Sequence, residues 1–263
     1  MPAAQVQTVT GRVPADELGF TLPHEHTAIT LWGIRNRWDY WELTADEPIV
    51  ATELEAFRAL GGSCLVDLTL PGVGRDPRWL RRLAERTGLR IVMGAGWYRE
   101  AYYPPEALID RRSVESLADE LVREFHEGVG ETGIRPGILG EIGTDKPWVS
   151  AQEERVFRAV ARASRATGMA VTTHAVMSDV GLAQLRTLEG AGVDPGRVVI
   201  GHADRVLLSQ DVCHNSQLKP YGGNGYVYLQ ETFLPRLRGA GVPEATIQRL
   251  TVDNPRRVLA LAV

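Results

Sequence analysis

The chain has 263 residues, of which 44% are hydrophobic and 24% charged, and its formal net charge at pH 7 is −4. This length is close to that of one TIM-type barrel, so we expect a single domain over residues 1–263. Acidic and basic residues are interspersed, no stretch approaches 18 uninterrupted apolar residues, and the first twenty residues lack a basic segment followed by an apolar run; we therefore expect a cytoplasmic protein that binds neither nucleic acid nor membranes.

From residue 62 onward, short apolar runs alternate with longer segments that have helical spacing. This alternation is typical of βα units around a parallel sheet. Each run is short and almost wholly apolar, as strands covered on both faces are. The sequence predicts seven strands, at residues 20–29, 64–70, 90–97, 137–143, 169–174, 198–202 and 206–211.

Three helices have clear sequence signals. Apolar residues recur at spacings of three and four from Val114 to Phe125, which predicts an amphipathic helix. Ser150 and Glu153 have the spacing of a capping box and predict the start of the helix after the fourth strand. The last helix is expected to begin near Pro255, because proline is favoured in the first turn.

Two histidines lie close together on the first predicted strand. In an extended segment His24 and His26 point to one face and Glu25 to the other. Two imidazoles on one face can share a metal ion, although such a pair can also be a hydrogen-bonded surface pair.

Four more candidate ligands stand at the ends of later apolar runs: Glu141, His174, His202 and Asp211. In a parallel barrel the carboxyl ends of the strands are where sites are built. Taken singly, each could be a loop acid or a hydrogen-bonded core histidine. Their common position at strand ends instead favours a site for two divalent metal ions, with zinc as the expected metal.

Such a site would hydrolyse a small molecule with an activated ester, lactone, amide or phosphoester bond, and Asp211 would be both a ligand and the general base. Trp97, Tyr98 and Tyr103 follow the third strand and are expected to line the substrate pocket, although packing against a neighbouring loop is an equal alternative. Residues 222–225, Gly-Gly-Asn-Gly, lack the strand and helix of a phosphate-binding loop and are interpreted as a flexible lid or turn.

Several segments together resemble the phosphotriesterase family of the amidohydrolase superfamily, from about Gly11 to the C-terminus. The most specific are LPHEH, GILGEIGTD, ARASRATGMAVTTHA, IGHADR, LLSQDVCHNSQLKPYGG and DNPRRVL. The resemblance implies a (β/α)8 barrel with two zinc-like ions. Within it, the histidine pair of LPHEH matches the first strand, His174 and His202 match the fifth and sixth strands, and Asp211 matches the eighth.

Glu141 matches the bridging position of the family. Many relatives use a carboxylated lysine there, so Glu141 departs from the best-known pattern and resembles the phosphotriesterase-related branch. That branch is similar to proteins associated with lactone, ester or N-acyl amide hydrolysis.

One spacing departs from a complete barrel. His202 and Asp211 are nine residues apart, whereas a parallel crossover takes about a dozen residues or more. The sequence therefore predicts a barrel that lacks one βα unit between residues 204 and 206, by natural deletion, by engineering or because a segment is unrecorded. We expect Asp211 to lie remote from metals held by His174 and His202 of its own chain unless the barrel is rebuilt, or to enter the site of a second protomer in a homodimer.

The first interpretation is thus a metal-dependent hydrolase. The alternative is a catalytically impaired paralogue that binds a metal or a small molecule. A degenerate structural paralogue would hold no stoichiometric metal at all.

Overall fold

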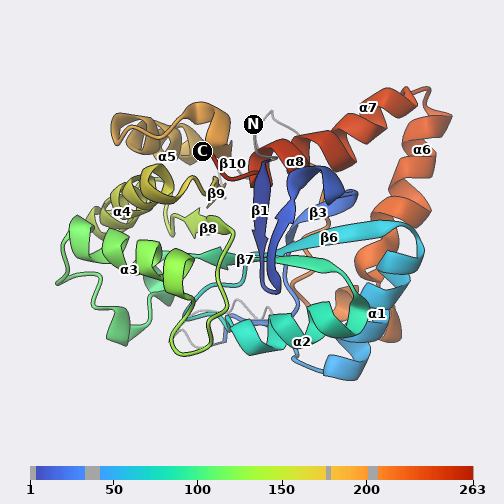
Figure 1. Cartoon of the computed structure of the whole chain (residues 1–263), viewed down its shortest axis with the longest axis horizontal. Helices are drawn as coiled ribbons and strands as arrows, with labels where there is room; N and C mark the ends of the chain where they lie inside the picture. Colours follow the sequence, from blue (N-terminus) through green and yellow to red (C-terminus); the bar gives the residue numbers. More distant parts are fainter. Residues whose placement is uncertain (1–3, 33–41, 176–178, 201–206, 263) are drawn as a thin grey trace.

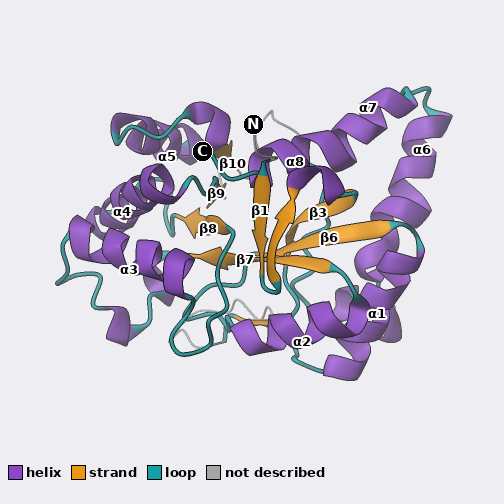
Figure 2. Ribbon diagram, in the orientation of Figure 1, coloured by secondary structure: helices purple, strands orange, loops and turns teal. Residues whose placement is uncertain are grey.

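The computed structural model describes residues 4–32, 42–175, 179–200 and 207–262. A parallel sheet with the order β10-β9-β8-β7-β6-β3 forms its centre. The sheet curls into a half-barrel, and the helices lie around it (Figures 1 and 2). Its strands are β3 (Phe20–Glu25), β6 (Gly62–Asp67), β7 (Arg90–Ala95), β8 (Ile138–Gly143), β9 (Val171–His174) and β10 (Val198–Ile200).

Eight helices are found among the described residues. They are α1 (Glu47–Ala59), α2 (Pro77–Thr87), α3 (Val114–Glu127), α4 (Ala151–Thr167), α5 (Val180–Gly190), α6 (Leu234–Gly239), α7 (Glu244–Gln248) and α8 (Asn254–Leu259). Two small antiparallel pairs, β1 (Gln5–Thr8) with β2 (Gly11–Pro14) and β4 (Ile29–Thr30) with β5 (Glu42–Leu43), complete the regular structure. No helix in the described part of the chain is long and apolar enough to cross a membrane.

The helix predictions are confirmed. Helix α3 spans the predicted apolar repeat. At the start of α4, the Ser150 hydroxyl accepts the Glu153 N–H at 3.2 Å and the Glu153 carboxylate accepts the Ser150 N–H at 2.8 Å, which is the predicted capping box. Pro255 lies in the first turn of α8. Of residues 222–225, the first three form a turn after the short helical segment Lys219–Tyr221, and the last begins the segment Gly225–Val227.

The central strands of the sheet, β6, β7 and β8, are almost wholly buried. Leu65 of β6, Val92 of β7 and Leu139 of β8 are fully buried, and Phe157 of α4 is buried in the same core cluster as Leu65 and Leu139. Burial on both faces explains why these strands read as apolar runs rather than alternating ones. The packed core holds the carboxyl ends of the strands in fixed relative positions.

Six of the seven predicted strands are observed, and the seventh is wrong. Residues 207–211 form no strand; Val206 lies outside the described residues. Asp211 has a φ of +53°, in the left-handed region, which interrupts an extended backbone. Side-chain contacts to β3 hold this segment instead of a strand ladder: the Ser209 hydroxyl accepts the His24 N–H at 3.1 Å.

The junction agrees with the predicted loss of one βα unit. Strand β10 ends at Ile200, and the next described residue is Leu207. The six residues between them are fewer than a parallel crossover takes. Among the described residues, no strand lies between β10 and the segment that runs beside β3. The predicted α/β barrel fold is therefore confirmed as a six-stranded half-barrel.

Candidate metal centre

The candidate ligands come together at the carboxyl ends of the central strands. His24 is near the end of β3 and His26 follows it, Glu141 lies in β8, and His174 ends β9. Asp211 comes from the irregular segment beside β3. His202 lies outside the described residues. Strand ends that are far apart in the sequence thus lie together at one edge of the sheet, which is where sites form in barrel-type sheets.

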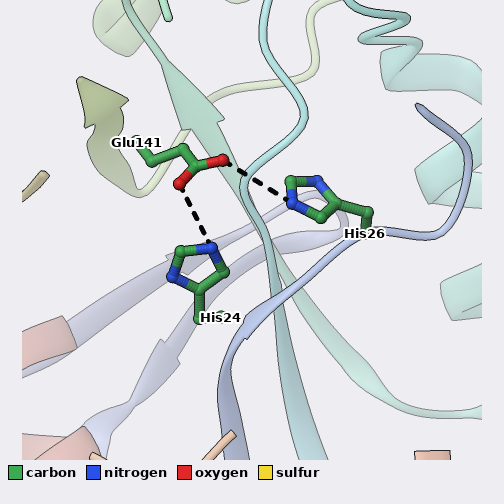
Figure 3. A group of neighbouring side chains, drawn as sticks. All are labelled: His24, His26 and Glu141. Carbon is green, nitrogen blue, oxygen red and sulfur yellow. Dashed lines mark ion pairs between the residues drawn. The ribbon is translucent and has the colours of Figure 1, made fainter. Parts of the chain in front are cut away.

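Glu141 faces both histidines of β3 (Figure 3). Its Oε2 atom lies 3.3 Å from Nε2 of His24, and its Oε1 atom lies 3.7 Å from Nε2 of His26. Potential ligand atoms of these three residues all lie within 4.8 Å of one another. Glu141 and His26 are almost fully buried, whereas the His24 side chain is 23% exposed.

His174 of β9 contacts the same carboxylate. Its Nδ1 atom lies 2.8 Å from Oε2 of Glu141, and its Nε2 atom lies 3.1 Å from the hydroxyl of Tyr98. The Oε2 atom of Glu141 therefore lies close to both His24 of β3 and His174 of β9. Tyr98 is brought to the edge of the site; roles of Trp97 and Tyr103 in substrate binding remain predictions.

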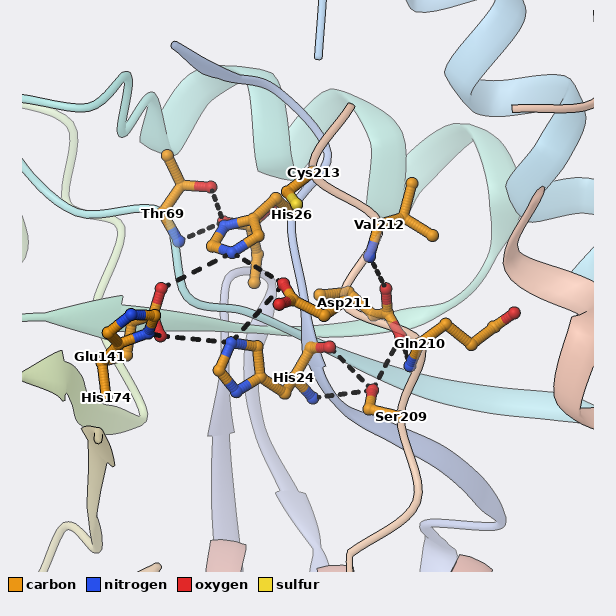
Figure 4. Close-up of polar contacts among 12 residues, drawn as sticks. His24, His26, Thr69, Glu141, His174, Ser209, Gln210, Asp211, Val212 and Cys213 are labelled. Carbon is orange, nitrogen blue, oxygen red and sulfur yellow. Dashed lines mark hydrogen bonds and ion pairs between the residues drawn. The ribbon is translucent and has the colours of Figure 1, made fainter. Parts of the chain in front are cut away.

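Asp211 joins the cluster within its own chain (Figure 4). Its Oδ1 atom lies 3.4 Å from Nε2 of His26 and 3.7 Å from Nε2 of His24. The expectation that Asp211 lies remote from the site is therefore wrong. That expectation assumed that residues 202–211 continue as a strand or fold back as a hairpin. The described part of this segment, residues 207–212, forms no strand and contacts β3 through Ser209, Gln210 and Val212. No exchange between protomers is needed to bring Asp211 to the site.

A second layer of contacts orients His26. Its Nδ1 atom lies 2.9 Å from the hydroxyl of Thr69, and the N–H of Thr69 donates to Asp67 at 3.0 Å. The other carboxylate oxygen of Asp67 accepts the N–H and hydroxyl of Thr27. With Nδ1 occupied in this way, Nε2 of His26 is the nitrogen that faces the site. No sequence signal marks Thr69 for this task.

The charges of the site are strongly coupled. Burial opposes the protonated form of His24, but the charge of Glu141 and then that of Asp211 outweigh it and raise its pKa to about 9. Burial likewise opposes ionisation of Glu141, yet the histidines around it, His174 first, hold its pKa well below the usual range. An ionised carboxylate surrounded by imidazoles is a donor set that suits a metal ion. A bound cation would displace the protons of the imidazoles and take their nitrogens as ligands.

The chain belongs to the phosphotriesterase family. The family model described as "Phosphotriesterase family" matches residues 4–205 and residues 200–259. The two matched parts overlap at residues 200–205, between β10 and the segment that carries Asp211. Together with the fold and the cluster of strand-end ligands, this membership makes the chain a phosphotriesterase-like hydrolase.

Three relatives illustrate the similarity. The phosphotriesterase homology protein of Escherichia coli K12 is 31% identical over 289 residues, with 91% of this chain and 97% of the relative covered. The human N-acetyltaurine hydrolase is 28% identical over 345 residues, with 98% of each chain covered. A mutant of a PTE-like lactonase from Deinococcus radiodurans superposes with a TM-score of 0.83 at 27% identity, covering 97% of this chain and 100% of the other.

Both sequence alignments are longer than the 263 residues of this chain. They therefore open gaps in this chain, as expected if it lacks a unit that its relatives contain.

Proposed function

We propose that the protein is a binuclear metal-dependent hydrolase that acts through a metal-activated water. The ligands would be His24, His26, Glu141, His174, His202 and Asp211, and zinc is the proposed metal. One observation carries the proposal: the two oxygens of the buried Glu141 carboxylate face imidazole nitrogens from two different strands.

The described residues fit a pair of divalent ions. His24, His26 and His174 lie within 4 Å of the Glu141 carboxylate, Asp211 lies beside His24 and His26, and His202 is proposed to join His174. Imidazole nitrogens and carboxylate oxygens suit zinc and similar cations. Two ions held there would polarise the substrate oxygen and lower the pKa of a water molecule.

Asp211 is suited to accept the proton of the attacking water. Burial alone would raise its pKa, but the hydrogen bond and charge of His26 and the charge of His24 lower it, so the side chain is an ionised carboxylate near neutral pH. Half of the side chain is exposed, in contrast to the buried Glu141. A base has to be reachable by substrate and water, and Asp211 meets this requirement.

The proposed substrate carries a lactone, ester, N-acyl amide or organophosphate-type bond. Relatives named as a lactonase and as an N-acetyltaurine hydrolase support the ester and amide classes. Tyr98 beside His174, together with Trp97 and Tyr103, is proposed to form part of the substrate pocket. The position of Asp211 beside His24 and His26 supports an active enzyme over an impaired binding paralogue, because the short junction does not displace the proposed base.

The test combines metal analysis with a substrate panel. Purified protein, loaded with zinc and then freed of excess metal, should retain two ions per chain. It should hydrolyse at least one member of a panel of lactones, aryl esters, N-acetyl amino acids, N-acetyltaurine and an organophosphate triester, and chelation should abolish the rate. Retained affinity for a panel member without a metal-dependent rate would identify a binding paralogue. Failure to retain stoichiometric metal would contradict the metal centre.

A further inference from the structure

Glu25 lies between the two histidines of β3 and is fully buried. Its carboxylate accepts backbone N–H groups of the segment that carries Asp211. The Oε1 atom accepts the N–H of Gln210 at 2.8 Å, and the Oε2 atom accepts the N–H of Val212 at 2.8 Å. Both backbone neighbours of Asp211 are therefore held by one carboxylate.

Ser209 strengthens the same connection. Its hydroxyl lies 2.7 Å from Oε1 of Glu25 and 2.7 Å from the carbonyl oxygen of His24, so its single proton can serve either acceptor. The hydroxyl also accepts the N–H of His24. The segment is thus fastened to β3 immediately beside one of the proposed ligands.

These contacts replace a strand ladder. Asp211 has a left-handed backbone, and residues 207–212 form no strand. The other edge of the sheet is β10, and no described strand lies between this segment and β10. The position of the Asp211 carboxylate therefore depends on contacts with β3 to a greater degree than in a closed barrel, where strands would pair on both sides.

We propose that Glu25 is a positioning residue that holds Asp211 against the metal site, in place of the strand pairing that the described residues do not provide. The proposal rests on the proposed metal centre. Glu25 takes no part in the chemistry itself, because its carboxylate accepts hydrogen bonds from the backbone N–H groups of Gln210 and Val212. It acts on the site only through Asp211.

The experiment measures metal binding by chelator competition and by the absorption spectrum of the cobalt-loaded protein. Glu25→Gln keeps the shape of the side chain but turns an amide N–H₂ toward at least one donor of the segment. We expect the weaker of the two metal sites to lose about 10- to 100-fold in affinity, the range found when a residue supporting a ligand is changed. The cobalt spectrum should change in the same way as in Asp211→Asn.

A double mutant separates positioning from general damage. If Glu25 acts through Asp211, the combination of Glu25→Gln with Asp211→Asn should bind metal no more weakly than Asp211→Asn alone. Glu53→Gln is the matched control, since the carboxylate of Glu53 is buried on α1 and accepts the N–H of Lys219 at 2.9 Å without contacting Asp211. It should leave metal affinity within about twofold of the wild type, against the larger loss from a residue that supports a ligand.

Additive losses in the double mutant, or equal losses in Glu25→Gln and Glu53→Gln, would overturn the proposal. Should Glu25→Gln not fold, Ser209→Ala carries the test, with a smaller loss in the same direction expected and no loss counting against it. Wild-type protein that retains no metal would overturn the metal centre and this role with it. Wild-type protein with two ions and an unaffected Glu25→Gln would overturn the role of Glu25 alone.

Discussion

Oδ1 of Asp211 lies 3.4 Å from Nε2 of His26, so a carboxylate from the last quarter of the chain meets a histidine from the first strand of the sheet. This contact forms although the sequence between β10 and Asp211 is too short for a βα unit. It places Asp211 beside two of the proposed metal ligands in the half-barrel.

Asp211→Asn should lower kcat by about 10²- to 10⁴-fold, the usual contribution of a general base. Asparagine suits the test because it tolerates the left-handed backbone at φ +53° better than most residues do. Asp110→Asn, an exposed aspartate that contacts Arg111, is the control and should leave kcat unchanged. Steady-state kinetics on the best substrate of the panel would decide, and an unaffected Asp211→Asn would remove this residue from the mechanism.

Glu141→Gln should reduce the retained metal below two ions per chain and lower the rate, because it removes the anionic bridge between the histidines of β3 and β9. Because Glu141 is a plain carboxylate rather than a modified lysine, activity should also be independent of added bicarbonate. Metal analysis of dialysed protein and rates with and without bicarbonate check both statements. Glu154→Gln, on the exposed side of α4, serves as the control. Two retained ions and a normal rate in Glu141→Gln would show that the bridge is assigned to the wrong residue.

Metal affinity should rise with pH between about 6.5 and 9. Burial disfavours the protonated His24, but Glu141 and Asp211 outweigh this and raise its pKa from 6.5 to about 9. In the metal-free protein this proton stabilises the fold below about pH 6.5, and the contribution is lost as the pH rises through about 9. A metal ion has to displace the proton, so affinity should increase up to about tenfold per pH unit for each proton released.

Calorimetry in buffers of different ionisation enthalpy would count the released protons, and thermal unfolding of the metal-free protein would follow its stability. The carboxylates of Glu141 and Asp211 have lowered pKa values and stay ionised across this window. Metal binding without proton release at pH 7 would contradict the coupling of His24 to these carboxylates.

Ser150→Ala should lower the free energy of unfolding by about 1 kcal/mol, because it removes the side-chain half of the capping box of α4. Phe157→Ala, in the buried face of the same helix, should cost about 3–5 kcal/mol through the cavity it leaves. Urea denaturation of both variants measures the difference. Equal losses would mean that packing of Phe157 stabilises α4 no more than the cap does.

The sequence by itself determined the βα rhythm, six of the strands and the start of α4, because these depend on local signals: apolar runs, helical spacing and a capping box. It also selected Glu141 and His174 as candidate ligands, because the carboxyl end of a parallel strand can be recognised from the sequence. Family membership agreed with the segments that carry these residues.

Only the tertiary structure decided where Asp211 lies. The number of residues between His202 and Asp211 excludes a parallel strand at Asp211, but a segment can also lie beside the sheet without pairing as a strand. Here the buried carboxylate of Glu25 accepts the N–H groups on both sides of Asp211 instead. Such a contact joins residues that are far apart in the sequence and leaves no periodic pattern, so spacing along the chain could not reveal it. For the same reason, the support that Thr69 gives to His26 became visible only in three dimensions.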